Sequence, residues 1–260
     1  MADFVLIRKS RNILSSVLHV VMNIALAVGS IYITLLTTSP IIGLLLVLLS
    51  KWRMFAVRWR YLSLNIKSNL VDLIVGCSFV LIAYCAGTIL LPIHIILAVL
   101  YSFWLIVIKP RSTNVAAEIQ SVFAVFFGTT ALSLMAANAD SIVFVIGGFI
   151  IGYAAIRHVL VQGDNDDYGI LLVSGGLITA EICWLCHSWL IVYSFMNTGI
   201  IIPQLSIILT ILAYVCGFTY KSLSRNSGKI KWGEVGIPIA FSILLILFIV
   251  IWFSQPIFNV

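Results

Sequence analysis

Charged residues are scarce in this chain of 260 residues, and acidic residues are scarcer than basic ones. Only 9% of the residues are charged, against about a quarter in soluble domains, and 62% are hydrophobic. The chain has nine Asp and Glu residues against fifteen Lys and Arg. So little charge excludes an ordinary soluble domain. The composition predicts an integral, multi-pass membrane protein, located in the inner membrane if its source is a bacterium.

Motifs of well-known enzyme chemistry are also missing. No HExxH, GxSxG or P-loop pattern occurs in a context that supports catalysis, so the sequence does not favour an enzyme. The seven lysines all lie between apolar runs or at their ends, which excludes a covalent retinal pigment. The basic residues form short clusters between apolar runs, a pattern that membrane topology explains, so no nucleic-acid partner is expected.

Apolar runs divide the chain into about nine predicted transmembrane helices, all belonging to one domain, residues 1–260. The predicted spans are residues 13–36, 40–49, 69–86, 88–108, 117–137, 141–161, 169–196, 199–220 and 235–253. The first run is too long for a signal-peptide core and is interpreted as an uncleaved span. The run at 40–49 is short enough to be a re-entrant or tilted element. The expected fold class is therefore an all-α membrane helical bundle.

The basic residues predict the orientation of this bundle. With nine spans and the N-terminus inside, all fifteen Lys and Arg fall on the inner side, as the positive-inside rule requires. The outer connections then carry a single charge, Asp140, and the C-terminus lies outside. The most cationic segment is 51–67, whose aromatic and basic residues would occupy different faces of one helix. This pattern indicates an interfacial helix on anionic lipid headgroups, although snorkelling residues at the end of a span explain it equally well.

One predicted span combines a carboxylate, an imidazole and two thiols in an apolar segment. If the helix begins near Gly169, Glu181 lies about 18 Å along it, near the middle of a hydrocarbon core about 30 Å thick. A carboxyl group at that depth is expected to be protonated, paired or directed into a polar cavity. His187 lies about 120° round the helix, so a partner for Glu181 has to come from another span.

The expected partners of Glu181 lie in two other spans. Small and polar residues form a stripe along the first span that includes His19 and Asn23, and a similar stripe in the span at 199–220 includes Thr210. We expect the first, third, seventh and eighth spans to form an inner ring around a neutral Glu181, with His187 nearby. The apolar ninth span is expected at the rim. Two readings remain open: a protonatable site in a cavity, or a carboxyl hydrogen-bonded between helices.

Two further groups of residues suggest local interactions. Asp72 and Glu118 each lie about one turn inside the inner face and are expected to pair with Arg157. Cys183, Cys186 and His187 match the pattern for covalent c-type haem attachment. However, the motif lies inside an apolar helix, so structural cysteines are the favoured interpretation, no cofactor or metal is assigned, and thiol redox chemistry and metal binding remain alternatives.

Glycines at positions 148 and 152 and the small residues 174–176 are typical of helix faces that pack closely. For the whole protein, the favoured hypothesis is a small transporter or permeation protein that uses a cavity at Glu181. The alternative is a non-catalytic membrane subunit or assembly factor with a membrane-protein partner. The sequence names no substrate.

Overall fold

The computed structural model describes residues 2–87, 91–137, 139–160, 169–189, 191–195, 198, 200–226 and 228–252, with side chains from residue 15 onward except that of residue 195. Apart from one short hairpin the described chain is helical, which confirms the expected class. The elements are α1 (Ala2–Thr37), α2 (Pro40–Ser50), α3 (Trp52–Phe55), α4 (Trp59–Cys85), α5 (Pro92–Phe103), the π-helical turn η1 (Trp104–Ile108), α6 (Asn114–Met135), α7 (Ser141–Leu160), α8 (Gly169–His187), β1 (Val192–Phe195), β2 (Ile200–Pro203), α9 (Gln204–Arg225) and α10 (Trp232–Trp252).

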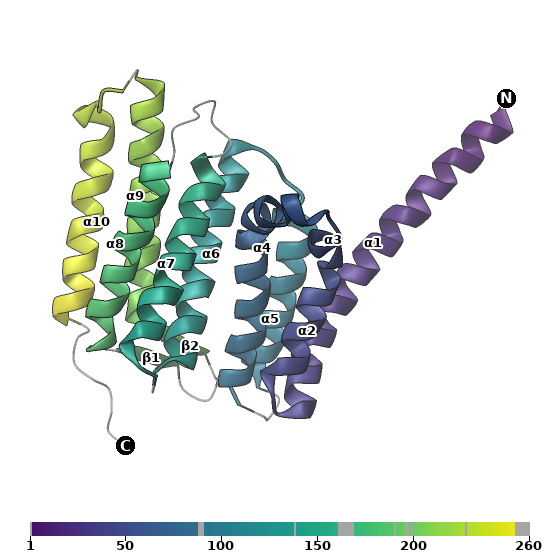
Figure 1. Ribbon diagram of the computed structural model, residues 1–260, viewed down its shortest axis with the longest axis horizontal. Coiled ribbons are helices and arrows are strands. Elements are labelled where there is room, and N and C mark those ends of the chain that lie inside the picture. Colours follow the sequence, from purple (N-terminus) through teal and green to yellow (C-terminus); the bar gives the residue numbers. More distant parts are fainter. Residues whose placement is uncertain are drawn as a thin grey trace.

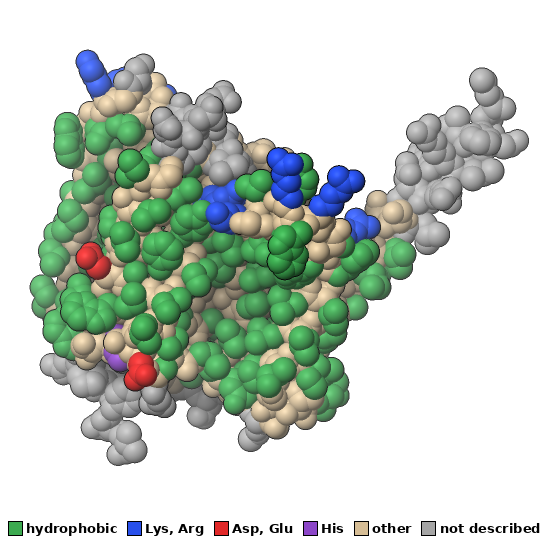
Figure 2. All heavy atoms as spheres, viewed as in Figure 1, with side chains coloured by type: hydrophobic (Ala, Val, Ile, Leu, Met, Phe, Trp, Pro, Cys, Tyr) green, Lys and Arg blue, Asp and Glu red, His purple; other side chains and the backbone are tan. Residues whose placement is uncertain are grey.

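Seven of the described helices are long and apolar enough to cross a membrane, so the chain is a multi-pass membrane protein by length and composition. They are α1, α4, α6, α7, α8, α9 and α10, and two shorter apolar helices cover Pro40–Ser50 and Pro92–Ile108. Helices alternate in direction along the chain once the shorter helices α2 and α5 are included, so that α1, α4 and α6 run the same way (Figure 1). Lys and Arg side chains gather along the end where α3 lies (Figures 1 and 2). The count of nine spans and the orientation stay predictions.

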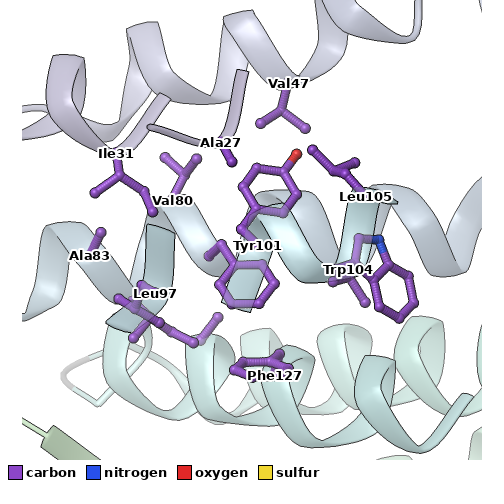
Figure 3. Close-up of a cluster of buried hydrophobic side chains, with 14 of the residues drawn as sticks. Ala27, Ile31, Val47, Val80, Ala83, Leu97, Tyr101, Trp104, Leu105 and Phe127 are labelled. Carbon is purple, nitrogen blue, oxygen red and sulfur yellow. The ribbon is translucent and has the colours of Figure 1, made fainter. Parts of the chain in front are cut away.

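The centre of the bundle is formed by α4, α5 and α6. The helices α4 and α6 are the most deeply buried of the seven long ones, and the aromatic rings of Tyr101, Trp104 and Phe127 fill the space between them (Figure 3). The predicted inner ring is therefore wrong in part: the third span, α4, is central, but α1 and α8 lie on opposite sides of the bundle (Figure 1). Large aromatic side chains, rather than polar stripes, decide which helices meet. The ninth span, α10, lies at the rim as predicted.

The small-residue faces of α7 and α8 pack against each other, whereas the sequence predicts close packing at each face without naming its partner. A Cβ atom added to Gly148 would come within 2.7 Å of the Cys183 sulfur, and one added to Gly152 would come within 2.3 Å of the Thr179 hydroxyl. From the other side, a Cβ on Gly176 would meet the ring of Phe149. The two backbones can approach this closely only because these positions lack side chains.

Two segments differ from the expected helices. Residues 192–195 and 200–203 pair as two antiparallel strands, with Val192 opposite Pro203. The second strand contains three isoleucines, whose β-branched side chains favour extended backbone. As a result α8 ends at His187. In the segment 51–67, α3 ends at Phe55 and the backbone is extended at Arg58 before α4 begins, so this segment is not one helix. The chain has to reverse here between the antiparallel helices α2 and α4. Its interfacial location stays a prediction.

Candidate functional site

Glu181 lies on the exposed side of α8. The same helix buries Gly176, Ala180 and Cys183, which belong to the face that packs on α7. No hydrogen bond or ion pair joins Glu181 to any residue that the structure describes. Because α8 ends at His187, the carboxylate is about 9 Å from that end and about 18 Å from the other. It is therefore shallower than expected and does not point into the bundle.

The residues expected around Glu181 are engaged elsewhere. His19 Nδ1 lies 3.1 Å from Asn23 Nδ2 on an exposed part of α1. The Thr210 hydroxyl donates to the backbone carbonyl one turn earlier in α9, at 2.6 Å. His187 Nε2 lies 3.1 Å from a carbonyl oxygen in the connection between α6 and α7. Polar residues in apolar helices can satisfy their hydrogen bonds locally in this way, so they need not converge on one site.

Glu181 belongs to an exposed stripe that runs along α8, here called the α8 stripe. It consists of Ile170, Ser174, Leu177, Glu181, Trp184 and Ser188, all of them exposed. Successive members are four, three, four, three and four residues apart, the spacing of a seam along which two helices pack. Its three polar members are Ser174, Glu181 and Ser188, which are seven residues apart. The stripe therefore carries two polar groups two turns apart within α8, and a third directly after its last residue, on a face that no described helix covers.

The cysteine motif that follows Glu181 is part of the packing between helices. Cys183 is buried against Gly148, and neither Cys183 nor Cys186 forms a disulfide. The His187 ring makes an edge contact with the Phe144 ring, with centroids 4.7 Å apart. Within the described residues, no group of three or more His, Cys, Asp or Glu side chains could hold a metal ion. These contacts fit the interpretation of structural cysteines.

A second polar site is centred on Asp72, in α4. The Lys51 ammonium is 2.5 Å from Asp72 Oδ2, and the Lys109 ammonium is 2.8 Å from the same oxygen. Trp104 Nε1 donates to Asp72 Oδ1 at 3.1 Å, and Lys51 also donates to the Asp72 backbone carbonyl at 2.7 Å. The side chains of Lys51 and Asp72 are 7% and 14% exposed, whereas that of Lys109 is 42% exposed. This cluster is called the Asp72 cluster below.

The π-helical turn η1 explains how two of these residues reach the same carboxylate. In an α-helix, residues five positions apart point about 140° away from each other. In η1 the backbone N–H of Lys109 instead donates to the Trp104 carbonyl, at 2.9 Å, so the turn widens. Trp104 and Lys109 can then both contact Asp72. Single π-helical turns of this kind are frequent at functional sites.

The predicted pairing with Arg157 is not seen. Glu118 instead lies 3.4 Å from the Lys221 ammonium, which reaches it from the end of α9. Asp72 pairs with Lys51 and Lys109, so the structure does not bring the three expected residues together as one cluster. Lys51, Trp104 and Lys109 were not predicted, because their spacing in the sequence is not periodic. The sequence did contain one indication: each lysine directly follows an apolar run, and from that position a long lysine side chain can extend back along the neighbouring helix.

Comparisons of the chain with protein-family models, curated proteins and solved structures find no match. The function is therefore inferred from the geometry of the α8 stripe.

Proposed function

We propose that this multi-pass membrane protein is a membrane subunit that binds a transmembrane helix of a partner protein through the α8 stripe. The observation that carries the proposal is the exposed Glu181 carboxyl within an apolar span, with no partner among the described residues. On insertion scales a charged side chain costs about 2.5 to 3.5 kcal/mol at the centre of a transmembrane helix, so this range is an upper bound for Glu181, which lies about 9 Å from the end of α8. A partner helix that supplies a hydrogen-bond donor would offset this cost.

The rest of the stripe supports a helix as the occupant. Ser174 lies two turns before Glu181 on the same exposed face, and Ser188, seven residues after Glu181, is exposed directly beyond the end of α8. Small and polar side chains at such spacing are typical of packed transmembrane helices, where they allow close approach and form hydrogen bonds. The large exposed side chains of Leu177 and Trp184 alternate with them and would provide the contact area.

Charge complementarity favours a partner helix that carries Lys or Arg at the depth of Glu181. A second copy of this chain, related by a two-fold axis, would place two carboxyl groups together and would repel when they ionise. A different protein with a basic residue avoids that repulsion. The transporter hypothesis is supported less well, since it needs Glu181 to face an internal cavity, and the side chain is exposed on the outside of α8.

Site-specific photocrosslinking tests this proposal in the native membrane. A photoreactive residue is placed at Leu177 in the stripe and, as a matched control, at Phe241, an exposed residue of α10. The expected result is one partner product from position 177 and none from position 241. Recovery of the partner in mild detergent should fall about three- to fifteenfold for Glu181→Leu, and less for Glu181→Gln, which keeps an acceptor.

Three outcomes would contradict the proposal. Equal crosslinking from both positions would indicate random encounters in the bilayer. A product of twice the chain's mass would identify a second copy as the occupant. Unchanged partner recovery for the folded Glu181→Leu protein would show that the carboxyl group does not contribute to the interaction. If that protein also lost solute uptake, the result would favour the transporter hypothesis.

A further inference from the structure

A cleft opens beside the Asp72 cluster, at the basic end of the bundle. Its volume is about 220 Å³. The residues that line it come from the end of α2, from α3, from the first turns of α4 and from the residue after η1: Ser50, Lys51, Arg53, Met54, Asn65, Asn69, Asp72 and Lys109. Asn65 of α4 links this part of the lining to α3, because its side-chain amide donates a hydrogen bond to the Met54 carbonyl at 2.8 Å. The cleft therefore has a defined, polar lining.

The charges that line the cleft do not balance. Three cations, Lys51, Arg53 and Lys109, face a single carboxylate, so the lining carries a formal excess of two positive charges. The carboxylate of Asp72 is already engaged, since one oxygen accepts from Trp104 and the other contacts both lysines. It has little capacity left to neutralise a third cation.

Hydrogen-bond donors remain unused in the same lining. Among the described contacts, Lys51 uses two of its three donors, both on Asp72, and Lys109 uses one of three. The guanidinium of Arg53 has five donors and no described partner. The complementary ligand has to bring negative charge and several acceptor oxygens. A phosphate group supplies both, and arginine recognises it through two parallel hydrogen bonds.

Two more observations agree with an anion. Burial lowers the pKa of the Lys51 ammonium below its ordinary value, and the charge of Lys109 lowers it further, although Asp72 opposes the shift. An anion in the cleft would oppose both effects, because a nearby negative charge favours the charged form of Lys51. At about 220 Å³ the cleft is smaller than most pockets for drug-sized ligands, which have volumes of about 300 to 1,000 Å³, so it suits a small headgroup better than a larger ligand.

We propose that this cleft binds a phosphate-bearing anion, either the headgroup of a net-anionic phospholipid or a free phosphate ester. This site goes beyond the proposed function, because it lies on α2, α3 and α4 rather than on α8. Two exposed tryptophans belong to the same segment: Trp52 lies in the sequence between the lining residues Lys51 and Arg53, and Trp59 begins α4. Tryptophan is enriched at the level of lipid headgroups, so the surroundings are those in which a phospholipid would present its phosphate.

Binding measurements on the purified full-length protein test the site. In mixed micelles, the affinity for phosphatidylglycerol is compared with that for phosphatidylcholine, in the wild type and in Arg53→Ala. Arg53 has no described partner, so its replacement should leave the fold intact. The matched control is Arg58→Ala, which removes the same charge from an exposed residue of the same segment that does not line the cleft.

The expected result is a loss of about tenfold or more in affinity for phosphatidylglycerol in Arg53→Ala, against less than about twofold in Arg58→Ala. Lys109→Gln should show a loss similar to that of Arg53→Ala. Equal losses in Arg53→Ala and Arg58→Ala would indicate diffuse surface attraction and would overturn the proposal, as would an affinity for phosphatidylcholine equal to that for phosphatidylglycerol.

Soluble competitors distinguish the two sources of phosphate. Displacement of phosphatidylglycerol by millimolar glycerol 3-phosphate would identify a site for free phosphate esters. Binding of the phospholipid without competition by glycerol 3-phosphate or inorganic phosphate would identify a headgroup site. Both results require that the cleft bind a phosphate group. If phosphatidylglycerol, glycerol 3-phosphate and inorganic phosphate all failed to bind, the proposal would be refuted.

Discussion

Removal of the Asp72 carboxylate should destabilise the protein more than removal of its closest lysine. In Asp72→Asn the Lys51 ammonium, 7% exposed, loses its counter-ion and stays next to the Lys109 ammonium. Breaking a buried ion pair by removing one partner typically costs about 3 to 5 kcal/mol, because the other charge is left uncompensated. The amide can still accept from Trp104, so we expect a loss near the lower end of that range.

Lys51→Met should cost less, about 1 to 2 kcal/mol. The carboxylate of Asp72 would keep the Lys109 ammonium at 2.8 Å and the Trp104 indole at 3.1 Å, so no charge is stranded. The methionine side chain would retain most of the buried hydrocarbon of lysine. What is lost is the ion pair and the hydrogen bond to the Asp72 carbonyl, and part of this loss is offset because an ammonium no longer has to be buried.

Reversible unfolding in mixed micelles, followed by tryptophan fluorescence, measures both changes. Glu118→Gln is the matched control, because its ion pair with Lys221 is 3.4 Å long and both side chains are at least 31% exposed. Exposed pairs contribute about 0 to 1 kcal/mol. The expected order of destabilisation is Asp72→Asn, then Lys51→Met, then Glu118→Gln. A larger loss of unfolding free energy for Lys51→Met than for Asp72→Asn would refute the argument that the Asp72 carboxylate compensates both lysines.

Three other predictions concern packing and topology. Gly152→Ala should lower the free energy of unfolding by about 1 to 3 kcal/mol, because its Cβ has no room against α8, whereas Gly217→Ala, in open space, should be neutral or stabilising by up to about 1 kcal/mol. His94→Ala should lower the free energy of unfolding by about 2 kcal/mol or more in the same assay. It leaves two backbone groups without their hydrogen bonds to the imidazole: the Ala83 carbonyl near the end of α4 and the Leu91 N–H at the start of α5. Ser39→Cys and Thr198→Cys should react with an impermeant maleimide from the outer side alone. Reaction of both from the inner side would contradict the predicted orientation, and reaction of Thr198→Cys alone from the inner side would contradict the count of nine spans.

The general architecture could be predicted from the sequence because it depends on composition and short-range pattern. Runs of apolar residues long enough to cross a bilayer are visible without knowledge of the neighbours, and so are the glycines at 148 and 152 that let α7 and α8 approach. The arrangement of the helices could not be predicted in the same way. It depends on contacts such as that of Phe79 with Tyr101, whose rings stack at 5.0 Å across α4 and α5.

The candidate sites show the same limit. The exposed face shared by Ser174, Glu181 and Ser188 follows from helical periodicity, so it was visible in the sequence, but the side of the bundle to which that face points was not. The Asp72 cluster draws Lys51, Asp72 and Lys109 from three segments separated by 21 and 37 residues. Its geometry also depends on a π-helical turn, which no simple sequence rule predicts.

The two proposed sites should act independently of each other. The α8 stripe offers a carboxyl group that needs a donor, whereas the cleft offers donors that need an anion, and Figure 1 shows α8 and α3 on different sides of the central helices. Glu181→Leu should therefore lower partner recovery about three- to fifteenfold and leave phosphatidylglycerol affinity within about twofold of the wild type. Arg53→Ala should lower phosphatidylglycerol affinity about tenfold or more and leave partner recovery unchanged. Measurement of both properties in both variants checks this. Loss of both properties in either folded variant would mean that one interaction controls both sites, and the separate assignments would then fail.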